Sequence, residues 1–155
     1  MAIEDDIKFL ERVPMLRLVG RAGLRIIAIG SEIRYVHGGE VLFHKDTHSD
    51  GGYVVQEGAF SLSSDPEAHT RDLIAGPGTL MADMALMTET KHGLTATAIE
   101  PATVVRIPRS LFLKMLEGYP DAARRLHEHI AARSDRTARD LLGVHQRLAS
   151  RDRSS

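Results

Sequence analysis

The 155-residue sequence contains no cysteine and no tryptophan, and only 5% of its residues are aromatic. Without cysteine it cannot form a disulfide scaffold, a thiol nucleophile, a zinc ribbon or an iron–sulfur cluster. No apolar run approaches the roughly 20 residues of a membrane span. The chain begins Met-Ala-Ile-Glu-Asp-Asp, which is acidic where a secretory signal is basic and then apolar. With 43% hydrophobic and 26% charged residues, these absences predict one cytoplasmic domain with no membrane association.

The formal net charge of −1 argues against a globally basic nucleic-acid binder, but the charge is unevenly distributed. Residues 121–155 contain eight arginines and five acidic residues. Such a segment is either the solvated face of a helix or a face that docks on an acidic partner, because a DNA reader usually concentrates more charge. We expect no direct DNA binding, since the sequence leaves no room for a helix-turn-helix module.

The pattern of apolar residues divides the chain into a helical beginning, a β-rich middle and a helical end. In residues 1–30, apolar side chains recur at helical spacing behind an acidic first turn, which predicts a helix. Pro14 interrupts this helical pattern, and a second helix is expected near Arg21–Ile29. Residues 31–108 contain short β-prone runs separated by glycines, with no helices between them. This predicts a mainly β fold of about eight strands, which is a sandwich, a barrel or a jelly roll (double-stranded β-helix).

Glycines punctuate the β-rich middle. A glycine supplies the positive φ that a tight hairpin turn requires. We therefore interpret the glycines of the first half as turn residues of the fold and not as site residues: Gly38, Gly39, Gly51, Gly52 and Gly58.

Residues 109–148 are expected to form a C-terminal helix pair, in which Pro120 opens the second helix, and residues 149–155 a disordered tail. Six residues of the second helix alternate at spacings of four and three: Ile130, Ser134, Thr137, Leu141, Val144 and Leu148. This seam either packs on the β-domain or forms a two-fold homodimer interface.

Particular residues narrow this architecture to a family. Four segments resemble the cyclic-nucleotide-binding domain family, whose β-roll is that of the catabolite activator. They are Phe9-Leu-Glu-Arg-Val-Pro-Met-Leu, Arg34-Tyr-Val-His-Gly-Gly-Glu-Val-Leu-Phe, Tyr53-Val-Val-Gln-Glu-Gly-Ala-Phe-Ser-Leu and Val105-Arg-Ile-Pro-Arg-Ser-Leu-Phe. The resemblance covers residues 9–126. It implies a β-roll flanked by helices and a ligand cassette between Gly78 and Ala98.

The resemblance also implies where a ligand would bind. Family members supply Gly-Glu-Leu-Ala, whose Glu binds the ribose, and then Arg-Thr-Ala or Arg-Ser-Ala, whose Arg binds the cyclic phosphate. At the matching positions this chain has Ala82, Asp83, His92 and Gly93. The expected ligand-binding residues are Leu80, Ala82, Asp83, Met84, Ala85, Lys91, His92, Gly93 and Leu94.

Each of these departures weakens a polar contact. A charged hydrogen bond is worth about 1.5–3 kcal/mol, so loss of the Arg lowers affinity roughly ten- to a hundred-fold. Lys91 is the candidate for restoring the positive charge, as a point charge on a flexible side chain. His92 is either a phosphate contact, with affinity that rises in mild acid, or an exposed loop residue.

The sequence thus predicts a small regulatory protein, not an enzyme, that binds a cyclic nucleotide or related small anion and signals through its C-terminal helices. A cyclic AMP or cyclic GMP ligand would bind weakly, and no other cofactor is expected. The alternative is a nucleotide-independent module with a vestigial pocket, which acts through an unidentified protein partner or a homodimer. Two histidine pairs, His44 with His48 and His127 with His129, are not expected to bind metal, because their spacing does not bring the side chains together.

Overall fold

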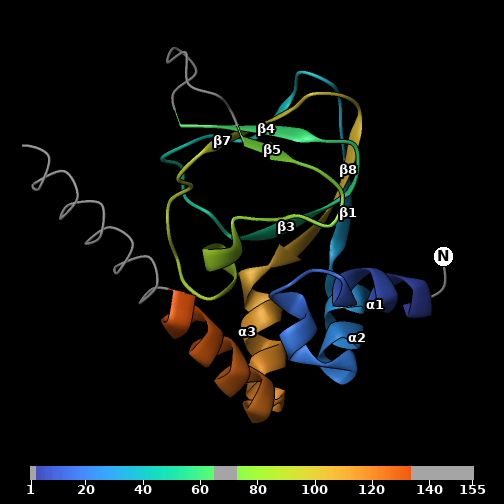
Figure 1. The fold of residues 1–155 in the computed structure, drawn as a ribbon, viewed down its shortest axis with the longest axis vertical. Coiled ribbons are helices and arrows are strands. Elements are labelled where there is room, and N and C mark those ends of the chain that lie inside the picture. The colour runs from blue at the N-terminus through green and yellow to red at the C-terminus, as the bar shows by residue number, and fades with distance from the viewer. Residues whose placement is uncertain (1–2, 65–72, 134–155) are drawn as a thin grey trace, which may run out of the picture.

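The computed structural model describes residues 3–64 and 73–133, and it shows two antiparallel sheets facing each other with helices gathered at one end (Figure 1). The first sheet has the spatial order β1 (Glu32–Val36), β8 (Ala102–Pro108), β3 (Gly51–Glu57) and β6 (Leu80–Met81). The second has the order β2 (Val41–Phe43), β7 (Thr95–Ala98), β4 (Phe60–Ser63) and β5 (Leu73–Ala75). Strands distant in sequence are thus neighbours, as in a jelly roll. The expected fold class is confirmed.

Four short helices pack under the roll. They are α1 (Ile3–Glu11), the 3₁₀ helix η1 (Leu16–Val19), α2 (Arg21–Gly30) and α3 (Arg109–Gly118). A further helix begins at residue 120 and continues to residue 133, the end of the described chain. We call it the C-terminal helix. The expected second helix and the helix start at Pro120 are confirmed.

The protein has two hydrophobic cores separated by the first sheet. One fills the roll and includes Phe43, Tyr53, Val55 and Phe60. The other lies between the first sheet and the helices, where the following residues are fully buried: Leu10, Leu16, Leu24, Ile27, Val54, Leu86, Ile107, Phe112 and Leu126. Successive residues Val54 and Val55 therefore point into different cores, which explains why β3 is buried on both faces.

Two details of the sequence interpretation are corrected. Gly51 and Gly52 are not turn residues, because both lie within β3 and pair with β8. A Cβ on Gly51 would come within 2.2 Å of the Ile107 carbonyl oxygen, so the glycine permits close strand contact. Gly39 and Gly58 have φ of +85° and +79°, as the turn interpretation requires.

Only the first residue of the proposed helical seam lies in the described chain. Ile130 is partly buried and packs against the helical core. The remaining seam positions, Ser134, Thr137, Leu141, Val144 and Leu148, lie outside the described residues, as does the predicted tail at 149–155.

Candidate functional site

The cassette predicted from the sequence connects β6 to β7. After β6 the backbone turns at Ala82, whose φ of +58° and ψ of +44° are in the left-handed region that glycine favours. The short 3₁₀ helix η2 (Asp83–Leu86) follows, and Leu86 is fully buried in the helical core. The chain then returns through residues 88–94 to β7. The cassette is therefore anchored at η2 to the helical layer and at its end to the roll.

The side chain of Arg109 joins the cassette to the residues that precede β3. One guanidinium nitrogen of Arg109 lies 3.1 Å from the Ser49 carbonyl oxygen, and 3.2 Å from those of Ala85 and Thr88, to which it donates. Arg109 thus joins η2, the following loop and the segment before β3. Its charge is directed to backbone carbonyls and not to the cavity described next.

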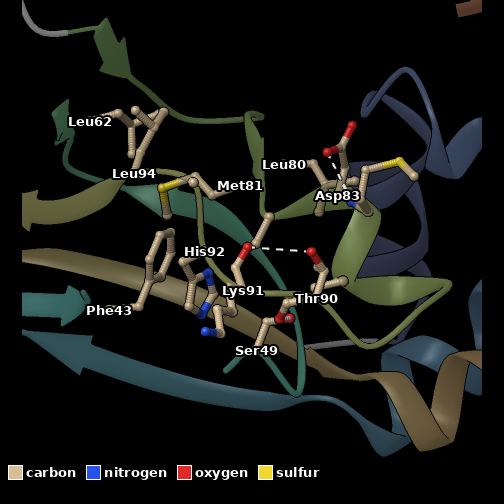
Figure 2. A pocket seen from close by; sticks show the side chains of 14 residues that line it. Phe43, Ser49, Leu62, Leu80, Met81, Asp83, Thr90, Lys91, His92 and Leu94 are labelled. Carbon is tan, nitrogen blue, oxygen red and sulfur yellow. Dashed lines mark hydrogen bonds between the residues drawn. The ribbon is translucent and has the colours of Figure 1, made fainter. Parts of the chain in front are cut away.

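A cavity of about 360 Å³ lies between η2, the 90–94 loop and the inner face of the roll. All nine residues that the sequence predicted line it: Leu80, Ala82, Asp83, Met84, Ala85, Lys91, His92, Gly93 and Leu94. Figure 2 shows the ring of His92 beside that of Phe43 at one end, and Asp83 at the other. The structure thus places the predicted residues around one space.

His92 is not an exposed loop residue, and that interpretation is wrong. Only 7% of the residue is exposed, and its ring stacks on Phe43 with centroids 3.9 Å apart and planes 13° from parallel. Phe43 in turn stacks on Tyr53, with centroids 5.6 Å apart. Burial lowers the pKa of His92 below its ordinary value, against the smaller opposing effect of Asp50. The imidazole is therefore neutral near pH 7 and offers no full charge to a phosphate.

The backbone on both sides of His92 is also fixed. Its N–H donates to the Thr47 carbonyl at 2.9 Å, and its carbonyl accepts from the Asp46 N–H at 2.8 Å. Ser49 donates to the Thr90 carbonyl through both its N–H, at 2.9 Å, and its hydroxyl, at 2.6 Å. The 90–92 segment is thus held against residues 46–49.

Asp83, at the position of the ribose-binding carboxylate, already has two partners. Its Oδ1 accepts from the Met84 N–H at 2.9 Å, and its Oδ2 forms an ion pair with Arg133 of the C-terminal helix. The Asp83 side chain is 24% exposed. A sugar hydroxyl would have to share this carboxylate with Arg133 or displace it. The pair also connects the cavity wall directly to the C-terminal helix.

Lys91 is the cation that lines the cavity. Its residue is exposed, and no carboxylate of residues 3–64 or 73–133 forms an ion pair with it. It precedes His92 in the chain, and its backbone forms an isolated bridge with that of His48. Lys91 therefore retains a free charge for an anionic group.

Sequence reasoning missed five residues that line the cavity: Phe43, Ser49, Leu62, Met81 and Thr90. Three come from β2, β4 and the segment before β3, which are distant from the cassette along the chain. Alternation of apolar residues would have marked Leu62 as inward-facing, but not Phe43, which ends the continuous apolar run of β2. Alternation also does not say which inward residues adjoin the cassette.

The described part of the chain contains neither a metal-binding cluster nor a membrane-spanning helix. No group of three or more His, Cys, Asp or Glu residues there could hold a metal ion. No helix among the same residues is long and apolar enough to span a membrane.

The β-roll thus holds a cavity between a short helix and a strand-connecting loop. Residues 33–119 match the family described as the cyclic nucleotide-binding domain, and the chain belongs to this family. A solved cyclic nucleotide-binding-like protein from Brucella abortus is 31% identical, with 73% of this chain and 98% of that chain covered at a TM-score of 0.65. The catabolite activator protein of Thermus thermophilus shares the fold, with 21% identity, a TM-score of 0.67 and coverage of 83% and 61%.

Two relatives are larger proteins. The HTH-type transcriptional regulator Cmr of Mycobacterium tuberculosis is 27% identical over 137 residues, which are 83% of this chain and 56% of the regulator. Lysophospholipase NTE1 of Chaetomium globosum is 29% identical over 100 residues, 63% of this chain and 7% of the lysophospholipase. The chain thus spans about half the length of one relative and a small part of the other.

Proposed function

We propose that this chain is a regulatory domain that binds a small organic anion in the cavity and signals through its C-terminal helix. A cyclic nucleotide is the first candidate ligand, because the family is named for it and the nine cassette residues gather around the cavity. The observation that carries the proposal is the Asp83–Arg133 pair, since it joins the cavity wall to the C-terminal helix. Ligand contact with Asp83 would change the position of that helix.

Calorimetric titration with cyclic AMP and cyclic GMP tests the proposal. We expect weak binding, because the cassette lacks a guanidinium at position 92. We expect a further loss of about tenfold in affinity in Lys91→Gln, which removes the positive charge from the cavity lining. Lys114→Gln is the matched control: Lys114 is an exposed lysine of α3 that does not line the cavity. Equal loss in both variants would contradict a role for Lys91.

The second candidate is a nucleotide-independent interaction module, with a protein partner or a homodimer formed through the C-terminal helix. The neutral, stacked His92 favours it, because the phosphate position has lost its charge. Sedimentation measurements with and without ligand distinguish the two functions. An association state that is the same with and without ligand, together with no detectable ligand binding, would support the module.

A further inference from the structure

The cavity is lined largely by apolar side chains. They come from both sheets and from the cassette: Phe43, Leu62, Leu80, Met81, Ala82, Met84, Ala85 and Leu94. Figure 2 shows Leu62, Leu94 and Met81 on the side facing the Phe43–His92 stack. Rings and methionine sulfurs attract aromatic rings, and burial of apolar ligand surface in such a lining is favourable.

Apart from Lys91, the cavity offers a cyclic phosphate few partners, because two N–H groups of η2 are engaged and the described lining has no guanidinium. The Met84 N–H at the start of η2 donates to the Asp83 carboxylate, and the Ala85 N–H donates to the Ala82 carbonyl. No arginine lines the cavity in the described chain. A phosphate and its sugar carry many polar atoms, and each one buried without a partner costs free energy.

One charged group can still be accommodated. Lys91 lines the cavity with its charge unpaired by any described carboxylate, and it lies next to the ring pair in sequence. A carboxylate presents two oxygens and a single charge, which one ammonium group can meet with a charge-assisted hydrogen bond. The lining therefore matches a ligand with one acidic group and an apolar ring.

We propose that the cavity selects a small aromatic carboxylate over a cyclic phosphate, with the ring among Phe43, Met81 and Leu94 and the carboxylate toward Lys91. This inference rests on the proposed function, since it names the class of anion for the same cavity.

Three probes test the selection: 2-naphthoate, its uncharged analogue 2-naphthamide, and cyclic AMP, each titrated calorimetrically into the full chain. We expect 2-naphthoate to bind at least about tenfold more tightly than cyclic AMP, and 2-naphthamide about tenfold more weakly than 2-naphthoate. Lys91→Gln should lower the affinity for 2-naphthoate by a similar factor and leave that for 2-naphthamide unchanged. Lys114→Gln should change neither.

The outcomes separate this inference from the proposed function. Tighter binding of cyclic AMP than of 2-naphthoate would overturn the inference and leave the proposed function in place. Binding of 2-naphthoate that is unaffected by Lys91→Gln would also overturn it. If neither 2-naphthoate nor cyclic AMP binds to a chain that circular dichroism shows to be folded, both the inference and the anion-binding function fail.

Discussion

At the scale of single residues, His92 shows how one substitution changes the chemistry of the cassette. The imidazole contributes to the roll as an aromatic side chain, stacked on Phe43 and largely shielded from water. A protonated ring at this place would have to be desolvated, with Asp50 as the nearby negative charge. His92 is therefore part of the apolar lining under neutral conditions.

The lowered pKa of His92 predicts a pH-dependent stability. The unfolded chain binds a proton at the ordinary pKa of about 6.5 and the folded chain only at lower pH, so protonation favours the unfolded state. The stabilisation is complete above about pH 6.5 and is lost as pH falls toward the lowered folded-state pKa. We expect the urea midpoint to decrease from about pH 7.5 to about pH 5.5, as measured by circular dichroism.

Two variants assign this effect. His92→Phe keeps an aromatic ring against Phe43 and should have a flatter dependence of the urea midpoint on pH than the wild-type chain. His37→Asn changes an exposed histidine and should leave the dependence as it is. Identical dependence in His92→Phe and the wild-type chain would show that His92 does not titrate in this way.

The sequence predicted the part of the candidate site that lies within one short segment of the chain, but not the contacts that this segment makes with distant residues. The spacing of Ala82, Asp83, Lys91 and His92 matches a family pattern within one short segment, so resemblance brings them together. The burial of His92 depends on Phe43, 49 positions away, and the partner of Asp83 is Arg133, 50 positions away. Such long-range pairings leave no mark in local periodicity.

At the scale of elements, β3 explains why two glycines were misinterpreted. A Gly-Gly pair is a common turn signal, but Gly51 and Gly52 begin β3, whose first five residues are all buried. Sequence pattern identifies a flexible backbone and does not tell a turn from a close approach of two strands. β6 shows a different limit of sequence pattern, because a strand of two residues is too short to show alternation of apolar residues.

The close approach of β3 and β8 predicts a large cost for a side chain at Gly51. In Gly51→Ala the new Cβ would overlap the Ile107 carbonyl oxygen at 2.2 Å, so the two strands must separate. We expect a decrease of about 1–3 kcal/mol or more in the free energy of unfolding, measured by urea denaturation. Gly76→Ala is the control, because a Cβ there meets no atom within 4 Å and the backbone is not in the left-handed region. Equal stability of the two variants would contradict the steric explanation.

At the scale of the whole molecule, the C-terminal helix contacts both the N-terminal helices and the cassette. Leu126 is buried in the helical core, and the Arg125 side chain donates to the Leu18 carbonyl at 2.8 Å. Seven residues beyond Leu126, Arg133 pairs with Asp83 at the cavity. Between these ends, a groove lined by Met15, His129 and other residues adjoins the wall formed by Asp83. The helix is thus positioned to respond to changes at η2.

This arrangement predicts coupled local motion when the contact is removed. Arg133→Gln should increase the rate of amide hydrogen exchange several-fold at residues 127–133 and at η2, because the ion pair that joins these two segments is removed. The two side chains are 52% and 24% exposed, and such pairs contribute at most about 1 kcal/mol, so global unfolding should change little. Arg124→Gln is the matched control, since among the described residues Arg124 forms its ion pair with Asp121, one turn away on the helix surface, and not with the cavity wall. Faster exchange at the helix end with no change at η2 would show that the Asp83–Arg133 pair does not couple the cavity to the helix.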